Sequence, residues 1–284
     1  MSDKLSDVSA RIDGIRQLGT VVNAMRGIAG ARIQKAREEL AAVDAYAGTI
    51  AESLGRVLAM APAAGSPAGR TERCARVVFC AEQGFAGAFS ERVLEAIAGD
   101  TDHATLLLIG TRGAALAAER GIGADYTAAM PSHSAGVPKL ASDIVDALAE
   151  RIARGHIDRV EAVYAETAGA AAPAVVRRPL LPLDPATFSR AAKAEPAILN
   201  LTVGDLLAGL TLEYLHALVC EAALHAFAAE NQARMNAMAA AHREIDRQLG
   251  VLQARYRQVR QEQITAEIVE LAGGAAASRR AAGS

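Results

Sequence analysis

The sequence predicts an α/β protein in which two long terminal helices pair as an antiparallel coiled coil and a small, partly parallel sheet domain is inserted between them. Two observations indicate this fold. Apolar residues recur at alternating steps of three and four through both ends of the chain, which is the spacing of a coiled-coil seam. Between the ends, short apolar runs alternate with helical patterns, which is typical of an α/β sheet.

The N-terminal seam runs from Leu5 to Val57, in a helix that we expect to begin near Ser2 and to end before Pro62. Each glycine inside this helix costs about 1 kcal/mol relative to alanine, so helix propensity alone would not select it. We expect the glycines to let a second helix approach closely. They are Gly14, Gly19, Gly27 and Gly30.

The C-terminal seam runs from Leu207 to Gln263, in a helix expected from Val203 to about Ala272, where Gly273 and Gly274 would end it. At 1.5 Å per residue, each terminal helix would be roughly 80–90 Å long. Polar residues interrupt the seam, and their expected role is to fix the register of the pairing. They are Glu221, Asn231, His242 and Gln263.

The middle of the chain predicts three strands, three helices and an extended edge segment. The strands are expected at 75–81, 104–109 and 159–165, the helices at 88–98, 112–120 and 138–154, and the proline-containing edge segment at 173–182. The expected organisation is therefore an N-terminal coil helix (1–61), an α/β domain (73–195), a C-terminal coil helix (202–274) and a tail (275–284). The pattern alone leaves open whether the two seams pair within one chain or between copies.

Composition excludes several classes of function. A formal charge of −2, an isoelectric point near 6.3 and the absence of tryptophan argue against a nucleic-acid-binding surface. Cys74, Cys80 and Cys220 have no metal-ligand spacing and are typical of buried thiols in a reducing compartment. The first residues resemble neither a signal peptide nor a transit sequence. No stretch of about 18 uncharged apolar residues occurs, so no membrane-spanning segment is expected.

One glycine-rich segment, Gly84-Phe-Ala-Gly-Ala-Phe-Ser, stands where a phosphate-binding loop would stand, after a strand and before a helix. It lacks the third glycine of the dinucleotide fingerprint and the Lys-Ser/Thr of a P-loop, so a tight strand-to-helix turn is favoured. The six histidines form no metal-ligand pair, and no catalytic acid–base pair is evident. The sequence predicts no catalytic, cofactor or metal site.

Several segments resemble the γ subunit of F-type ATP synthases. Near the N-terminus these are Arg11-Ile-Asp-Gly-Ile-Arg and Ala31-Arg-Ile-Gln-Lys-Ala-Arg, and the glycine-rich turn is similar to the family's Gly-Leu-Cys-Gly-Gly-Leu-Asn. The C-terminal match is the more specific one. It covers Glu230-Asn-Gln-Ala-Arg-Met-Asn-Ala-Met and Tyr256-Arg-Gln-Val-Arg-Gln-Glu-Gln-Ile-Thr-Ala-Glu.

The resemblance implies a non-catalytic rotor shaft with a Rossmann-like central domain. Its implied partners are the α and β subunits of an α3β3 ring, the ε subunit and the ring of c subunits, at the cytoplasmic face of a bacterial inner membrane as a peripheral subunit. It implies coupling of ion flow through the membrane sector to ATP synthesis or hydrolysis in the β subunits. The implied rotor–stator contact residues are Met25, Arg26, Arg260, Gln261, Thr265 and Glu267.

The chain also departs from the family pattern, at Asn23, Gly27, Gly30 and Ala86 and in the tail Ser278–Ser284. These departures indicate a divergent member, and because the first residues do not resemble a transit sequence, a bacterial one is expected. Two alternatives belong to other classes of protein. A free coiled-coil scaffold would form a homodimer through its seams, and a small nucleotide-binding enzyme would bind ATP or NAD on the sheet domain.

Overall fold

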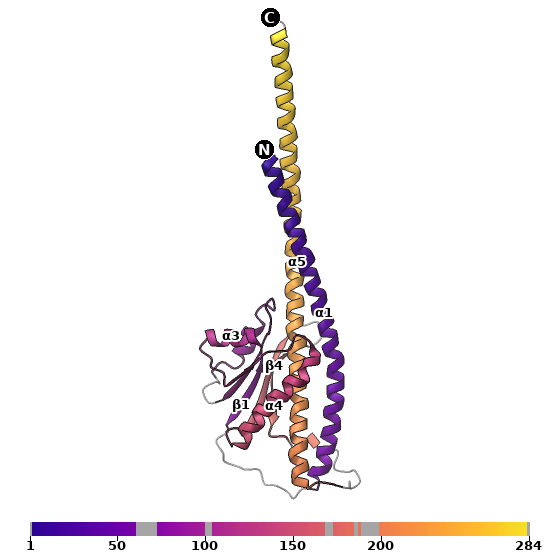
Figure 1. The fold of residues 1–284 in the computed structure, drawn as a ribbon, viewed down its shortest axis with the longest axis vertical. Coiled ribbons are helices and arrows are strands. Elements are labelled where there is room, and N and C mark those ends of the chain that lie inside the picture. The colour runs from indigo at the N-terminus through magenta and orange to yellow at the C-terminus, as the bar shows by residue number, and fades with distance from the viewer. Residues whose placement is uncertain are drawn as a thin grey trace. The chain divides into compact units, whose positions relative to one another are not determined.

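The computed structural model describes residues 2–60, 73–99, 104–167, 173–184, 187–188 and 199–282. It contains two long helices, α1 (Ser2–Leu58) and α5 (Val203–Ala282), with a sheet and shorter helices between them in the sequence (Figure 1). The chain divides into two compact units. The coil unit comprises Met1–Gly27 and Asn236–Ser284, and the α/β unit comprises Ile28–Met235.

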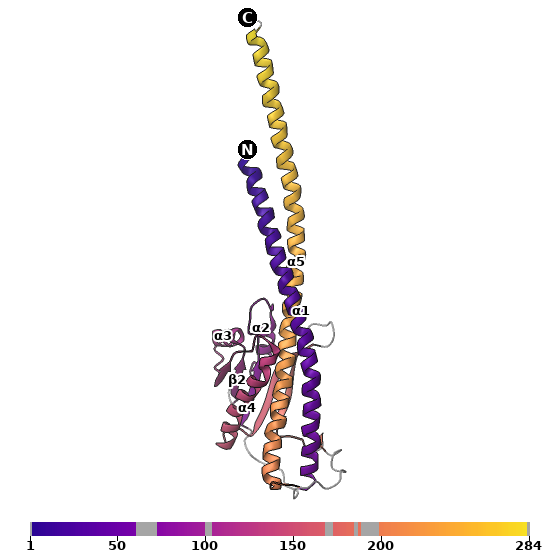
Figure 2. The same ribbon diagram turned by 45° about the vertical axis from the view of Figure 1, so that its right-hand side comes forward.

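In the coil unit, α1 and α5 pack side by side as an antiparallel pair (Figures 1 and 2). Gly19 lies against Ile245, and Val22 packs with Met238 and Ile245 in a small apolar core that Ile15 and Leu249 flank. Rising numbers on α1 thus meet falling numbers on α5. The pairing is within one chain, which settles the question that the seam pattern left open.

The seam assignment is confirmed along both helices. None of the predicted seam positions from Leu5 to Val57 on α1, or from Leu207 to Gln263 on α5, is exposed. A seam at a spacing of 3.5 residues keeps one narrow face of each helix toward its partner, so the remaining faces of the coil unit are free for charged side chains.

The α/β unit is built on a five-stranded sheet of order β3-β2-β1-β4-β5. All neighbouring strands are parallel except β5, which pairs antiparallel with β4 at one edge. The strands are β1 (Cys74–Phe79), β2 (Thr105–Ile109), β3 (Tyr126–Ala128), β4 (Arg159–Glu166) and β5 (Ala174–Leu181). The helices are α2 (Phe89–Glu95), α3 (Thr111–Glu119) and α4 (Val137–Ala153), with a 3-10 turn, η1, at Ser134–Gly136.

Helices cover both faces of this sheet because successive strand residues point to opposite sides. Val77 and Phe79 of β1 join a core with α4 and with α5 residues such as Leu215 and Val219. Val78 of β1 joins the opposite core with α2 and α3. Both cores are apolar, as expected when parallel strands are buried on two sides.

The α5 segment from Leu215 to Arg234 is the central helix of the α/β unit. Every residue in it is buried or half-buried, whereas a surface helix would bury one stripe only. Small side chains make this possible, since Ala222 and Ala226 lie in one sheet core and Ala229 and Ala233 in the other. Helix α5 therefore belongs to the sheet as fully as α4 does.

Most predicted elements of the middle of the chain are confirmed to within one or two residues, including the edge position of the proline-containing segment, which is β5. The three-residue edge strand β3 was not predicted, because Tyr-Thr-Ala is too short to show an alternating pattern. The division into segments 1–61, 73–195, 202–274 and 275–284 stays a prediction. Pro62 and most of the expected linker 184–200 lie outside the described residues.

Two expectations were wrong. Helix α5 does not end at Gly273 and Gly274 but continues to Ala282. A glycine in a helix costs only about 1 kcal/mol relative to alanine. The three alanines that follow these glycines favour the helix, so neither glycine has to end it. The glycines of α1 also do not all serve close packing. A Cβ at Gly19 would lie 3.3 Å from Ile245 Cγ2, but at Gly14 and Gly27 it would meet nothing within 4 Å.

One segment, Val203–Gly273 of α5, is long and apolar enough to cross a membrane by length and composition, with a mean hydropathy of 1.4 in its most apolar window of 18 residues. This is weak evidence for a span, because the core helix of a protein with no span passes the same test. In the α/β unit this helix already packs Leu215, Leu218 and Val219 into the sheet core.

The glycine geometry predicts different effects of alanine at two positions of α1. Gly14→Ala should raise the free energy of unfolding by about 1 kcal/mol, because alanine favours the helix and its Cβ meets open space. Gly19→Ala should give a smaller gain or a loss, because Ile245 must move. Thermal denaturation of the two variants measures the difference, and equal gains would contradict the packing described at Gly19.

Candidate functional site

All six predicted rotor–stator residues lie in the coil unit, but the structure places them in two groups. Met25 is half-buried and packs beside the Val22–Met238–Ile245 core of the coil. Its neighbour Arg26 is exposed, and the Arg26 Nη2 donates a hydrogen bond of 2.9 Å to Asn23 Oδ1. In this first group, therefore, only the side chain of Arg26 lies on the surface, whereas Met25 is part of the coil packing.

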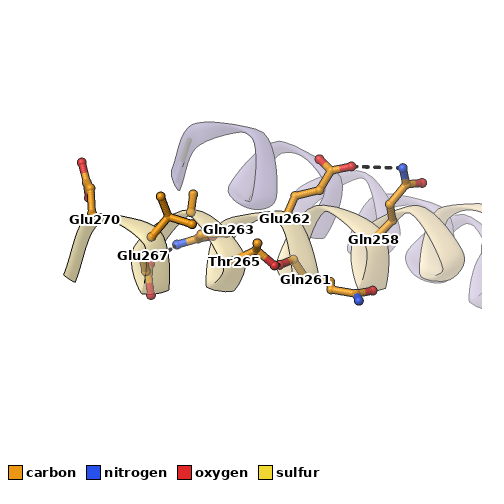
Figure 3. A pocket seen from close by; sticks show the side chains of 9 residues that line it. Gln258, Gln261, Glu262, Gln263, Thr265, Glu267 and Glu270 are labelled. Carbon is orange, nitrogen blue, oxygen red and sulfur yellow. Dashed lines mark hydrogen bonds between the residues drawn. The ribbon is translucent and has the colours of Figure 1, made fainter. Parts of the chain in front are cut away.

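The second group, on the C-terminal part of α5, is fully exposed and comprises Arg260, Gln261, Thr265 and Glu267. Thr265 Oγ1 donates to the carbonyl oxygen of Gln261 at 2.9 Å. Gln263 Nε2 donates to Glu267 Oε1 at 3.1 Å (Figure 3). These bonds join residues of the same helix, so the side chains are ordered by α5 itself.

An open groove of about 1020 Å³ lies along this stretch of α5 (Figure 3). Amides, carboxylates and one hydroxyl line it, and no histidine, cysteine or lysine lies among its lining residues. Such a surface can form hydrogen bonds with a partner through its amides, carboxylates and hydroxyl. The lining residues are Gln258, Gln261, Glu262, Gln263, Thr265, Ala266, Glu267, Val269 and Glu270.

Large apolar side chains are exposed on the same part of α5. Ile264, Ile268, Val269 and Leu271 are between 48% and 75% exposed. Here α5 extends past the N-terminal end of α1 (Figures 1 and 2), so no second helix covers it within the coil unit. Large apolar side chains exposed close together are typical of protein–protein contact surfaces.

The two groups are far apart along the coil. Met25 shares a core with Met238, and Arg260 lies 22 residues further along α5, a rise of about 33 Å. The two groups of predicted residues therefore do not form a single site.

The sequence analysis missed a buried polar cluster in the α/β unit, formed by Glu230 and Arg234 of α5. The two side chains form an ion pair and are only 3% and 5% exposed. Glu230 Oε1 accepts a hydrogen bond from the backbone N–H of Gln83 at 3.2 Å. Arg234 donates to the carbonyl oxygens of Gly84 at 3.2 Å and Gln83 at 3.3 Å. The available signal was a run of polar residues inside an alanine-rich, otherwise buried helix.

The polar seam residues fix the register less directly than expected. Asn231 is buried, but its Nδ2 donates to the carbonyl of Phe227 on its own helix, and its Oδ1 accepts from Arg234. His242 lies 3.0 Å from Asp246, also on α5. Of the four, Glu221 reaches another element, pairing with Arg178 of β5 at 2.5 Å.

The carboxylate of Glu82, just before the glycine-rich turn, occupies the N-terminus of α3. Glu82 Oε2 accepts hydrogen bonds of 2.9 Å from the backbone N–H groups of Thr111, at the start of α3, and Met130. A phosphate at the start of α3 would have to displace this carboxylate. The glycine-rich turn itself leads into a different helix, α2, and its interpretation as a tight structural turn stays a prediction.

The cysteines have the environment of inert structural thiols. Burial raises the pKa of Cys80 to about 12, with a further increase from the negative charge of Glu230. Burial also raises the pKa of Cys220 to about 12, although His216 lies 3.9 Å from its sulfur. A nucleophilic cysteine needs a lowered pKa. In the part of the chain that the structure describes, no group of three or more His, Cys, Asp or Glu residues could hold a metal.

These features define a shaft-type, protein-binding subunit. They are an intramolecular antiparallel coil, an α/β unit built around one of the two coil helices, and an exposed helical end with mixed polar and apolar side chains. A family model described as ATP synthase matches residues 4–277. The chain belongs to this family.

The curated relatives that it resembles are ATP synthase γ chains. That of Desulforamulus reducens is 27% identical over 278 residues, covering 95% of this chain and 98% of the relative. That of Chlorobium luteolum is 28% identical over 287 residues, covering 95% and 97%. Together with the family match, they show that the chain has the role of a γ subunit of the ATP synthase central stalk.

Solved structures share the fold. A chain of the Euglena gracilis mitochondrial ATP synthase, from a structure that holds OSCP, F1 and c-ring, aligns with a TM-score of 0.66 at 16% identity, covering 98% of this chain and 95% of that one. A chain of the rotor of the same enzyme aligns with a TM-score of 0.64 at 13% identity. The expected coiled coil with an inserted, mostly parallel sheet domain is thus confirmed.

The burial of Cys80 predicts its reactivity. Its thiol should not react with a maleimide at pH 8 in the folded protein, because the pKa near 12 leaves almost no thiolate and the side chain is 1% exposed. Mass spectrometry of tryptic peptides measures the labelling. Phe85→Cys, at an exposed position of the following turn, is the control that should be labelled fully. Rapid labelling of Cys80 in the folded chain would contradict this environment.

Proposed function

We propose that this chain turns as the rotor shaft inside a ring of three α and three β subunits. Its rotation would couple ion flow through a membrane sector to ATP synthesis or hydrolysis at the β subunits. The observation that carries this proposal is the intramolecular antiparallel coil with an unpaired α5 end of exposed apolar residues. A lone helix twists readily, whereas a two-stranded coil resists torsion.

The six predicted residues serve in this proposal as rotor–stator contacts, with Met25 and Arg26 in one zone and Arg260, Gln261, Thr265 and Glu267 in the other. The exposure of five of the six supports the assignment, as does the exposed apolar surface beside the second zone. An asymmetric shaft would make different contacts with each β subunit at each angle, which is how rigid-body rotation couples distant sites.

The proposed partners beyond the ring are an ε subunit and a ring of c subunits, and the proposed location is the cytoplasmic face of a bacterial inner membrane, as a peripheral subunit without a span of its own. We further propose that the chain has no catalytic, cofactor or metal site. The capping of α3 by Glu82 and the raised pKa values of Cys80 and Cys220 support this.

A free homodimeric scaffold, the main competing function, is disfavoured because each seam already has its partner in the same chain. A nucleotide-binding enzyme is disfavoured because Glu82 occupies the N-terminus of α3. Sedimentation of the isolated chain tests the scaffold, which requires a stable dimer. Equilibrium dialysis with ATP and with NAD tests the enzyme, which requires specific binding.

The shaft proposal predicts assembly in a 3:3:1 ratio when the chain is co-expressed with α and β subunits of a related bacterial enzyme. A cysteine replacing Ala272 should then form a disulfide-length cross-link to a cysteine on a β subunit and stop ATP hydrolysis, because the shaft can no longer turn. Reduction should restore the activity. Native mass spectrometry and an ATPase assay measure the two effects, and a chain that never enters the α3β3 ring would falsify the proposal.

The contact assignment predicts that Gln261→Ala combined with Thr265→Ala lowers the rate of ion-driven ATP synthesis by about tenfold, if each lost contact is worth about 0.7 kcal/mol. Gln253→Ala, at another exposed position of α5, is the matched control and should leave synthesis unchanged. Synthesis rates in reconstituted vesicles measure both. Equal rates for the two variants would remove the second zone from the set of contacts.

A further inference from the structure

Within the α/β unit, a turn of the sheet is bonded to α5 by buried charged groups. Eight polar or charged residues are buried among those that the structure describes, and four of them follow closely on α5: Glu230, Asn231, Gln232 and Arg234. Glu230 and Arg234 stand one helical turn apart and form an ion pair. We call these two side chains, with the backbone of Gln83 and Gly84 that they bind, the polar lock.

The polar lock is costly for stability alone. Removing a carboxylate and a guanidinium from water costs several kcal/mol per ion, and apolar residues of similar volume are often as stable or more stable. A buried ion pair has its best-attested use where a specific register must be held. Alanine and leucine contacts hold α5 against the sheet but are non-directional. Hydrogen bonds at fixed distances and angles do specify its axial position and rotation.

The geometry of the polar lock suits that use. Glu230 accepts a hydrogen bond from the backbone N–H of Gln83, and Arg234 donates to the carbonyl groups of Gln83 and Gly84. Three backbone groups of two consecutive residues are therefore bonded to α5. The next residue, Phe85, has a φ of +63°, the one non-glycine residue with positive φ among those described. A bulky residue persists in that conformation only where its surroundings impose it.

A second directional bond lies on the other side of α5. Glu221 pairs with Arg178 of β5, and nine residues separate Glu221 from Glu230, which is about half a turn around the helix and about 13 Å along it. Ion pairs on opposite sides of a helix resist its rotation about its own axis better than either pair would alone.

We propose that the polar lock transmits torque, with Glu230 and Arg234 as positioning residues that make α5 and the sheet turn as one body. This inference rests on the proposed function as a rotor shaft. Under load, apolar contacts alone would let α5 slip against the sheet, so that ions would pass without full rotation of the coil. The polar lock prevents this slip by fixing the 83–84 backbone to α5.

The test replaces both ions with apolar residues of similar length, Glu230→Met with Arg234→Met, in the complete ATP synthase assembled in vesicles. The variant should fold and assemble, because Gln83 is exposed and water can satisfy the released turn backbone. ATP hydrolysis should stay near the wild-type rate. Ions transported per ATP hydrolysed should fall by about threefold, since a residue in a coupling path contributes on the order of 0.5–2 kcal/mol.

The chain offers a matched control in Glu150 of α4 and Arg154, the residue that follows the end of α4. They form an ion pair at the same i, i+4 spacing, but their side chains are exposed and bind no other element in the described contacts. Glu150→Met with Arg154→Met should leave the ratio of ions to ATP unchanged. Hydrogen exchange followed by mass spectrometry should be faster in the peptide containing residues 81–90 of the Glu230/Arg234 variant, and unchanged in the control.

Arg234→Lys provides a milder variant that keeps the ion pair but loses the guanidinium fork. It should give an intermediate ratio of ions to ATP. An unchanged ratio in both the double variant and Arg234→Lys would overturn the proposal. So would loss of assembly in both, which would make the polar lock a requirement for folding only. These outcomes are distinct from failure of the shaft proposal, in which the wild-type chain itself would not couple ion transport to ATP hydrolysis.

Discussion

The burial of one α5 segment, Leu215 to Arg234, is the constraint on which the α/β unit depends. This segment lies in contact with both sheet cores, and the small side chains of Ala222, Ala226, Ala229 and Ala233 let the sheet approach it. Close packing of this kind leaves no room for larger side chains without strain. Helix α4 packs beside this segment in one sheet core, and α2 covers the opposite core.

The same helix meets a different requirement in the coil unit. There α5 buries only a narrow seam against α1, with Val22, Met238 and Ile245 at its centre. Its other faces are exposed and carry charged side chains and a few apolar ones such as Val251. Exposed i, i+3 pairs such as Glu244 and Arg247 add little to stability, although Arg247 lowers the pKa of Glu244 to about 2. A long coil whose exterior is largely charged and whose unpaired end is apolar is suited to move inside a protein collar.

Charged residues inside the α/β unit are placed where apolar packing would leave the position of an element undetermined. Glu161 of β4 accepts hydrogen bonds from Arg76 of β1 and Arg177 of β5. Burial alone would raise its pKa, but these bonds outweigh burial and lower it, so the carboxylate stays ionised. Two further ion pairs fix the position of α5 in the same way. They join Glu221 to Arg178 and Glu230 to Arg234. Together these groups tie strands and helix to one another in a defined register.

The sequence by itself determined the seams, the start of both terminal helices, the main strands and the edge position of β5, because period and proline placement are local properties of the chain. Only the tertiary structure decided that the seams pair within one chain. It also decided that Glu230 and Arg234 hold the turn at Gln83, since these hydrogen bonds join residues about 150 positions apart in the sequence. It also decided that Gly19, but not Gly14, meets a neighbour, because a glycine's use depends on what lies opposite it. The helix beyond Gly273 shows that a local stop signal yields when the residues after it favour the helix.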